Sequence, residues 1–439
     1  MKSHAGLEAL IQEVARRIKR VEESPGSTLV DRALLEVTKE RLEDQLDAWR
    51  QGRPSIDGEG CRSALFRSMG FLPTMYTTTY KFSPSDFRDD IATVEKLGLP
   101  ADKLCDKVVT QLAMRSADSA PKPDAILADS HGCDNDHKYY ARVQGDLFNI
   151  PVFFVDVPLH EDDKVTLTSI NYVAEQYGEF IEWAEKTVPG VKYDEDKHIE
   201  ALEMDAIARS YCRDIYQLLK HVPCPCDPRD ALGQWFSQFL PSRFPNMRKA
   251  AECIRHFRDQ LGERVASGKG PYPEERLRLL WAGMSHDLQV LDPRNLLLER
   301  RVALPMVVIG YTKVLNGLRG SLFGEVSEYG VKLSPLQHEA SEACASCWGG
   351  PGKRWVNDAL DVARDLGTHG IIHFQLVGCT PGRGMGSVLA ERADKELGIP
   401  TLNLEGRYLD RDYMSQERFE EILSTFIDQC FDRAGKPRQ

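Results

Sequence analysis

The amino-acid sequence predicts an α/β protein with two doubly wound parallel-sheet domains, an N-terminal helical segment and connecting helices. Short apolar runs bounded by Gly, Pro or Asp predict buried parallel strands. Helical patterns alternate with these runs through short connections, which is typical of flavodoxin-like or Rossmann-like sheets. The chain has 439 residues, 42% of them hydrophobic, and is therefore long enough for two domains with large cores.

The predicted elements follow one another in a regular order. Residues 6–50 carry apolar side chains at helical spacing with a break at 24–26, and the glycine-rich stretch 52–60 predicts a linker. Strands are predicted at 125–128, 151–155, 276–281, 304–309, 371–377 and 401–404. Further helices are predicted at 196–219, 246–267, 353–366, 387–397 and 415–430. The predicted division is a helical segment at 1–55, a first α/β domain at 56–240, a connecting helix at 241–272 and a second α/β domain at 273–439.

The charge balance argues against several classes of partner. Asp and Glu number 67 against 56 Lys and Arg, which gives a net charge of -11. Nucleic acids and anionic membranes select basic surfaces, so neither is an expected partner. No apolar run approaches the roughly 18 residues of a membrane span, and the N-terminus has the pattern of a charged amphipathic helix rather than a signal peptide. We therefore expect a cytoplasmic protein.

Eleven cysteines need an explanation, because structural disulfides are rare in a reducing cytoplasm. Cys212, Cys253 and Cys430 fall at apolar positions of predicted helices and are interpreted as buried structural thiols. Cys224 and Cys226 lie in a proline-rich segment and are interpreted as part of a structural turn. The other six cysteines are candidates for metal ligation.

Cys133 and Cys379 each follow a predicted strand, the first in Asp-Ser-His-Gly-Cys and the second in Leu-Val-Gly-Cys. Ligands of open α/β sheets bind at the carboxyl ends of strands. Two cysteines at this edge of two domains could face each other across an interdomain cleft, a usual location for a cofactor. Either one alone would equally fit a small residue in a tight turn.

Cys344 and Cys347 form a CxxC pair that is predicted to lie in a loop, before Trp-Gly-Gly-Pro-Gly. Two thiols at this spacing can hold one metal ion or one corner of a cluster. A thioredoxin-like redox pair is disfavoured, because such a pair opens a helix after a strand. The glycines would let the backbone approach a bulky inorganic group closely.

A glycine motif, Gly382-Arg-Gly384-Met-Gly386, lies between the strand at 371–377 and the helix at 387–397. Its spacing is G-x-G-x-G, whereas the dinucleotide fingerprint is G-x-G-x-x-G, so no NAD site is predicted. A helix N-terminus here could still favour an anion, including an iron–sulfur cluster with net negative charge. The sequence contains no P-loop motif, so no ATP site is predicted on this chain either.

Taken in order along the chain, these motifs resemble the 2-hydroxyacyl-CoA dehydratase and benzoyl-CoA reductase family. The C-terminal part carries most of the likeness, with a cysteine after a strand at 370–379, a Gly-Ile-Pro turn into the next strand at 398–404, and a final helix. Cys133 looks like the second cysteine site of the family, and Cys105 falls where the first is expected. Segments around 268–271, 310–313 and 344–347 look most like the larger catalytic subunit of ATP-dependent benzoyl-CoA reductases.

The resemblance implies an iron–sulfur catalytic subunit. In this family three cysteines, here Cys105, Cys133 and Cys379, hold a 4Fe-4S cluster with one iron left open. A separate ATP-hydrolysing iron–sulfur activator supplies single electrons, and the other implied partners are an acyl-CoA substrate and a homologous subunit or a second copy of the chain. Adding an electron to a thioester or aromatic ring needs a potential near the low end of the cluster range, roughly −700 mV.

Cys61, Cys344 and Cys347 form a second candidate triplet. The double-cubane branch of the family holds an 8Fe-9S cluster with six cysteines on one chain, so one cluster and a double cluster both stay open. The leading functional prediction is ATP-dependent reduction of an acyl-CoA, with an aromatic acyl group as the first candidate. The alternatives are a 2-hydroxyacyl-CoA dehydratase, a double-cubane reductase of small molecules and a non-catalytic iron–sulfur scaffold subunit.

Overall fold

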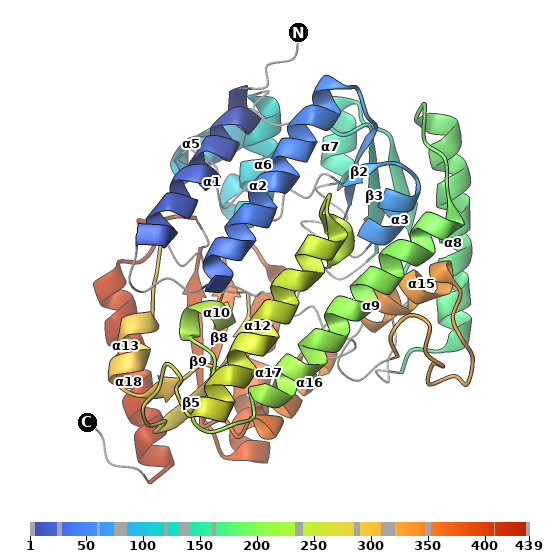
Figure 1. Cartoon of the computed structure of the whole chain (residues 1–439). Helices are drawn as coiled ribbons and strands as arrows, with labels where there is room; N and C mark the ends of the chain where they lie inside the picture. Colours follow the sequence, from blue (N-terminus) through green and yellow to red (C-terminus); the bar gives the residue numbers. More distant parts are fainter. Residues whose placement is uncertain are drawn as a thin grey trace.

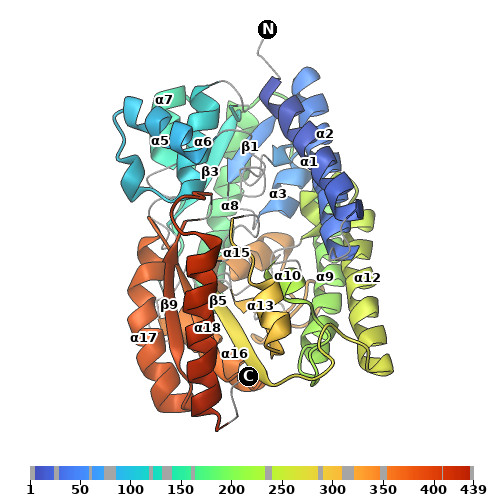
Figure 2. The same ribbon diagram turned by 90° about the vertical axis from the view of Figure 1, so that its left-hand side faces the viewer.

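The computed structural model describes residues 5–23, 29–58, 62–73, 86–117, 122–130, 141–159, 164–232, 240–284, 290–308, 321–346, 353–407 and 409–435. Within these ranges the chain forms two parallel sheets surrounded by helices (Figure 1). Figure 2 shows the first sheet in the upper half of the molecule, the second in the lower half, and long helices along one side of both. The predicted fold class is confirmed.

The first sheet has four parallel strands in the order β2-β1-β3-β4. They are β1 (Ser55–Gly58), β2 (Leu72–Pro73), β3 (Ala125–Asp129) and β4 (Val152–Val155). Because β1 pairs with β2 on one side and with β3 on the other, the strand order reverses at β1. β1 lies in the stretch predicted as a linker, so that prediction is wrong. Ser-Ile-Asp-Gly contains a single apolar residue, and its strand conformation depends on pairing with two neighbours.

The second sheet is built around β5 (Leu277–Gly283) and β8 (Gly370–Leu376), which pair in parallel over five residues. β9 (Thr401–Gly406) continues the sheet beyond β8, while β6 (Val302–Ala303) and β7 (Val307–Val308) both pair with β5. The predicted strands for β5, β8 and β9 agree with the structure to within two residues. The strand predicted at 304–309 contains only β7.

Helices cover the two sheets and also form a separate layer. The layer consists of α1 (Ala5–Glu23), α2 (Leu29–Arg50), α9 (Glu195–Leu218) and α12 (Met247–Ser267). The upper half of Figure 2 contains α3 (Ser63–Ser68), α5 (Phe87–Lys96), α6 (Asp106–Ser116), α7 (Ala141–Phe148) and α8 (Leu167–Thr187). The remaining helices are α10 (Pro228–Leu232), α13 (Arg294–Glu299), α15 (Pro335–Ala345), α16 (Lys353–Asp365), α17 (Thr380–Leu397) and α18 (Gln416–Arg433), with short 3-10 turns η2 (Ala101–Lys103) and η4 (Pro241–Arg243). The predicted helices do not include α3, α5, α6, α7, α8, α10, α13 and α15.

The five cysteines interpreted as structural lie in helices or in buried turns. Cys212, Cys224, Cys226 and Cys430 are buried in the large apolar cluster around the second sheet, and Cys253 packs against its edge. Burial raises the pKa of the thiols of Cys212, Cys224 and Cys430 to about 12. These thiols are therefore neutral near pH 7 and behave as small apolar side chains.

In the part of the chain that the structure describes, no helix has the length and apolar character needed to cross a membrane.

Candidate functional site

Cys105 and Cys379 occupy equivalent positions, each directly before the first residue of a helix. Cys105 is the N-cap of α6 and Cys379 is the N-cap of α17. Both residues are buried, with 7% and 9% of their surface exposed. Because the first turn of a helix carries partial positive charge on its amide groups, both thiols lie where a negatively charged group is stabilised.

The backbone segments that carry these two cysteines touch each other. Gly378 adopts a φ of +82°, and a Cβ built on it would lie 2.4 Å from the carbonyl carbon of Leu104 and 2.5 Å from the amide nitrogen of Cys105. Any side chain at this position would therefore collide with backbone atoms, which makes glycine a requirement of the contact. The structure thus brings Cys105 beside Cys379, although residues 105 and 379 are far apart in the sequence.

A buried ion pair fastens the Cys105 segment to the segment that follows β9. Asp106, the first residue of α6, is fully buried, and Nη1 of Arg407 donates to its Oδ1 at 2.8 Å. The backbone N–H of Leu409 donates to the other carboxylate oxygen at 2.9 Å, and Nη2 of Arg407 donates to the carbonyl of Asp102 at 3.2 Å. Asp106, which follows Cys105, is therefore fixed to the segment that follows β9. β9 is the neighbour of β8 in the sheet, and β8 is the strand that leads to Cys379.

Cys344 is the second-last residue of α15, so the prediction of a loop at this cysteine is wrong. The glycines that suggested a loop lie beyond the end of the helix. α15 packs against α8, and the Cys344 side chain belongs to the apolar cluster of the first sheet, whereas the predicted division put it with the second. Burial raises the pKa of this thiol to about 12, and the guanidinium groups of Arg354 and Arg62 act in the opposite direction.

Arg354 links Cys344 to the next part of the chain. This arginine is buried, and its Nη1 donates to the carbonyl oxygen of Cys344 at 2.9 Å and to that of Ser346 at 3.0 Å. Ser346 directly precedes Cys347 in the sequence. The end of α15 is therefore held in place by a buried positive charge.

Arg62 performs a similar role at the carboxyl edge of the first sheet. It forms a buried ion pair with Asp129, the last residue of β3, and its Nε donates to the hydroxyl of Tyr177 at 2.6 Å. Arg62 directly follows Cys61, and Asp129 stands four residues before Cys133. One buried ion pair thus joins the residue that follows Cys61 to the carboxyl end of β3.

Three of the six predicted ligands, Cys61, Cys133 and Cys347, lie outside the described residues. Among the residues that are described, no three His, Cys, Asp or Glu side chains come close enough to hold a metal ion. The described candidates fall into two places: Cys105 and Cys379 in the cluster of the second sheet, and Cys344 in that of the first.

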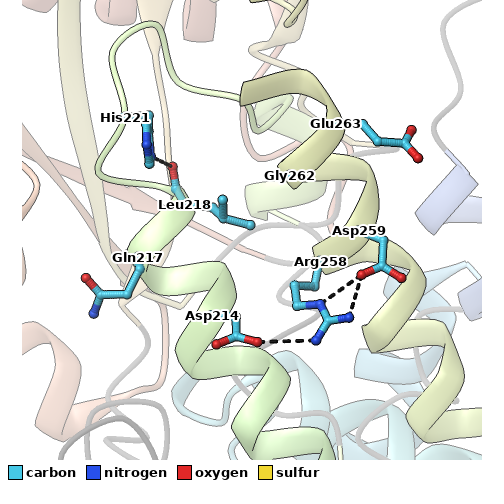
Figure 3. A pocket seen from close by; sticks show the side chains of 8 residues that line it. All are labelled: Asp214, Gln217, Leu218, His221, Arg258, Asp259, Gly262 and Glu263. Carbon is cyan, nitrogen blue, oxygen red and sulfur yellow. Dashed lines mark hydrogen bonds and ion pairs between the residues drawn. The ribbon is translucent and has the colours of Figure 1, made fainter. Parts of the chain in front are cut away.

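A surface pocket of about 480 Å³ lies elsewhere, between α9 and α12 (Figure 3). Arg258, one of its lining residues, donates to Asp259 at 2.6 Å and to Asp214 at 3.3 Å. Its charged groups are therefore largely paired with each other, and none of the candidate cysteines lines it.

Sequence reasoning does not find the buried charges around the candidate cysteines. Asp106, Arg62 and Arg354 are three charged residues in a chain that is 28% charged, and their neighbours do not distinguish them. The one available signal is adjacency, because Asp106 and Arg62 each directly follow a candidate cysteine. Their partners Arg407 and Asp129 are distant in the sequence and cannot be found in this way.

The fold and this geometry define a class: an α/β protein with two parallel sheets and two buried cysteines that each precede a helix and lie on backbone segments in contact. A family model described as 2-hydroxyglutaryl-CoA dehydratase, D-component, matches residues 62–430. The chain therefore belongs to this family, and the resemblance seen in the sequence motifs is confirmed.

The relatives that the chain matches are subunits of acyl-CoA dehydratases and of a reductase. It is 22% identical over 308 residues to the (R)-phenyllactyl-CoA dehydratase alpha subunit of Clostridium sporogenes, covering 68% of this chain and 69% of the relative. It is 21% identical over 316 residues to a subunit of the benzoyl-CoA reductase of Thauera aromatica, covering 70% of each. It is 22% identical over 310 residues to the alpha subunit of the (R)-2-hydroxyglutaryl-CoA dehydratase of Acidaminococcus fermentans, covering 70% of this chain and 60% of the relative.

Proposed function

We propose that this chain is the iron–sulfur catalytic subunit of an ATP-dependent acyl-CoA reductase of the benzoyl-CoA reductase type. Cys105, Cys133 and Cys379 would hold a 4Fe-4S cluster, and a separate ATP-hydrolysing activator would deliver electrons to it. The observation that carries the proposal is the contact of Gly378 with Leu104 and Cys105, which joins two helix-capping cysteines from distant parts of the chain.

The residues at this contact fit an iron–sulfur cluster in two respects. Thiolates are the ligands that such clusters use, and the backbone segments of two of the three proposed ligands touch here. The cluster with its thiolates carries net negative charge, and the N-terminal ends of α6 and α17 both offer partial positive charge at the cysteines. Three ligands instead of four would leave an open position for a substrate atom, as catalytic metal sites require.

When bound, the cluster would supply single electrons at low potential. The surrounding residues of this chain have separate tasks. Asp106 and Arg407 keep the Cys105 segment on the second sheet, and burial of both cysteines excludes water from their sulfur atoms. Water exclusion matters, because a reduced site of this kind would otherwise lose its electron to solvent or oxidants.

Replacement of the proposed ligands one at a time tests the cluster assignment. Cys105→Ala, Cys133→Ala and Cys379→Ala should each lose the cluster, which would be measured as iron and acid-labile sulfide per chain after anaerobic purification. Cys212→Ala and Cys253→Ala are the matched controls, since both lie on helices and should keep about four irons per chain. Full iron content in any of the first three variants would remove that cysteine from the ligand set.

A 2-hydroxyacyl-CoA dehydratase subunit is the second candidate function. It is favoured by the description of the matching family and by the names of two of the relatives above. The two activities differ in electron consumption: a reductase uses reductant in proportion to product, whereas a dehydratase returns its electron and needs only priming. An anaerobic assay with an activator and a limiting amount of reductant separates them. Product far in excess of the electrons supplied would establish dehydration and refute reduction.

A double cluster is supported by the residues around the second triplet. Arg62 follows Cys61, Ser346 precedes Cys347, and the charges of Arg62 and Arg354 both act on the Cys344 thiol. The described neighbours of all three cysteines therefore lie near one another. The buried guanidinium of Arg354, whose printed hydrogen bonds are to backbone carbonyls, would also compensate part of the negative charge of a second cluster.

Replacement of Cys344 and Cys347 together by Ser distinguishes one cluster from two. With a double cluster, iron should fall from about eight to about four per chain and low-potential reduction should disappear. With a single cluster, iron should stay at about four. The double variant Cys224→Ser with Cys226→Ser is the control, because this buried pair is assigned no ligand role. Full iron content and full activity after the Cys344 and Cys347 change would exclude any cluster role for this pair.

A further inference from the structure

We propose that His373, with Gln375 and Asn403, forms a polar support beneath the start of α17 that positions Cys379. The support acts through Gly386 and Gly382, two glycines of the motif Gly382-Arg-Gly384-Met-Gly386, which allow close packing of the helix. The role of Cys379 as a cluster ligand rests on the proposed function. The packing of the motif on the strands is independent of it.

The glycine motif belongs to the helix itself. α17 begins at Thr380 with a proline in its first turn, whereas the sequence predicts a helix from Ser387. Three glycines disfavour a helix by propensity, and this explains the late predicted start. The motif therefore occupies the first two turns of the helix. Because Cys379 is the N-cap of α17, the position of these two turns determines the position of Cys379.

Gly386 rests directly on three polar side chains from the strands below. A Cβ built on it would lie 2.2 Å from Nε2 of Gln375, 2.6 Å from Nδ1 of His373 and 2.7 Å from Oδ1 of Asn403. Glycine at 386 therefore lets the helix backbone descend onto β8 and β9. Gly384, two residues earlier, differs completely, since a Cβ there would meet nothing within 4 Å.

His373 is the central residue of this support. Its side chain is fully buried, and its Nδ1 lies 2.9 Å from Oδ1 of Asn403 and 3.4 Å from Nε2 of Gln375. Burial lowers the pKa of His373, so its imidazole is neutral near pH 7. Its Nδ1 is held by the side chains of β8 and β9, and Gly386 of α17 packs directly on this nitrogen.

Gly382 transmits this arrangement to the cysteine. A Cβ built on Gly382 would lie 3.1 Å from Sγ of Cys379, so the sulfur packs against this residue. The connection therefore runs from Asn403 and His373 to Gly386, and through the first two turns of α17 to Gly382 and the sulfur of Cys379. Loss of one hydrogen bond in this series should let the first turn of α17 open more often.

Alkylation of Cys379 in the metal-free protein measures that opening. The rate of reaction of a buried thiol with iodoacetamide follows the fraction of time for which it is open, and peptide mass spectrometry reports each cysteine separately. Asn403→Ala removes one hydrogen bond and should accelerate alkylation of Cys379 about fivefold. Gly386→Ala should have the same effect or a larger one. Cys430, buried under the same sheet, should react at an unchanged rate.

Gly384→Ala is the matched control, because it makes the same change in the same helix where space is free. Equal Cys379 rates in the native protein, Asn403→Ala and Gly386→Ala would overturn the proposal. An equal acceleration by Gly384→Ala and Gly386→Ala would overturn it as well. If Gly386→Ala also accelerates alkylation of Cys430, this variant is unfolding more widely. The Cys379 rate in Asn403→Ala, a change at an exposed position, then decides whether the support positions Cys379.

A second readout separates positioning from general stability. In protein reconstituted with iron and sulfide, Asn403→Ala should change the electron paramagnetic resonance spectrum of the reduced cluster at unchanged iron content and unchanged Tm. An identical spectrum would show that the support does not reach the cluster. A native protein that binds no iron would refute the proposed function, but the alkylation rates would still decide whether the support positions Cys379.

Discussion

Gly378→Ala is expected to separate the two cysteine segments and to destabilise the fold. The new Cβ would lie 2.4–2.6 Å from backbone atoms of Leu104 and Cys105, which have no flexible end that can move aside. The φ of +82° adds strain, because a left-handed conformation costs residues other than glycine about 1–2 kcal/mol. With overpacking of about 1–3 kcal/mol, the free energy of unfolding should fall by about 2–5 kcal/mol. Denaturant titration measures this change, and the iron content after reconstitution should fall with it.

Gly398→Ala is the control that separates strain from collision. Gly398 ends α17 with a φ of +68°, and a Cβ there would meet nothing within 4 Å. This variant should lose only about 1–2 kcal/mol and should keep its iron. Equal losses of stability in the two variants would mean that the contact of Gly378 with the Cys105 segment contributes nothing.

Asp106→Ala is expected to cost about 3–5 kcal/mol of unfolding free energy. The substitution leaves the Arg407 guanidinium, which is 7% exposed, without its carboxylate, and it removes the acceptor of the Leu409 N–H. An uncompensated buried charge is the reason for the large effect. Because Cys105 precedes Asp106, the variant should also bind iron more weakly.

An exposed ion pair supplies the comparison. Arg418 and Glu421 are 61% and 66% exposed, so Glu421→Ala should change stability by less than about 1 kcal/mol. A double-mutant cycle with Arg407→Ala isolates the coupling between Asp106 and its partner. Additive effects of the two single changes would contradict the assignment of this pair as the fastening between the segments.

The parts of the fold that the sequence predicts best are those with strong local patterns. β3 is an apolar run, β5 and β8 are mostly apolar, and β9 alternates apolar and polar residues; the predicted bounds of all four are close to those in the structure. β1 escapes prediction because Ile56 is its single large apolar residue and pairing with β3 makes it a strand. The start of α17 is not predicted because three glycines lower the helix propensity of this segment. In the structure, packing on His373 and Asn403 offsets that low propensity.

The candidate site depends on contacts that no local pattern records. A strand end and a turn suffice to single out Cys379, but Cys105 rests on family resemblance alone. Their proximity is set by Gly378 and by the pair of Asp106 with Arg407, whose members are 301 residues apart in the chain. The CxxC pattern singles out Cys344 as part of a predicted pair, while the packing of α15 against α8 decides which sheet it joins.

The contact between Gly378 and Cys105 also has a consequence for biosynthesis. Gly378 follows Cys105 by 273 residues, so a ribosome working at about 5–20 residues per second makes it roughly 14–55 s later. During that interval the Cys105 thiol has neither its neighbour Cys379 nor the Arg407 that fixes Asp106. If the proposed cluster is held by both segments, it can be inserted only after translation has passed the second sheet.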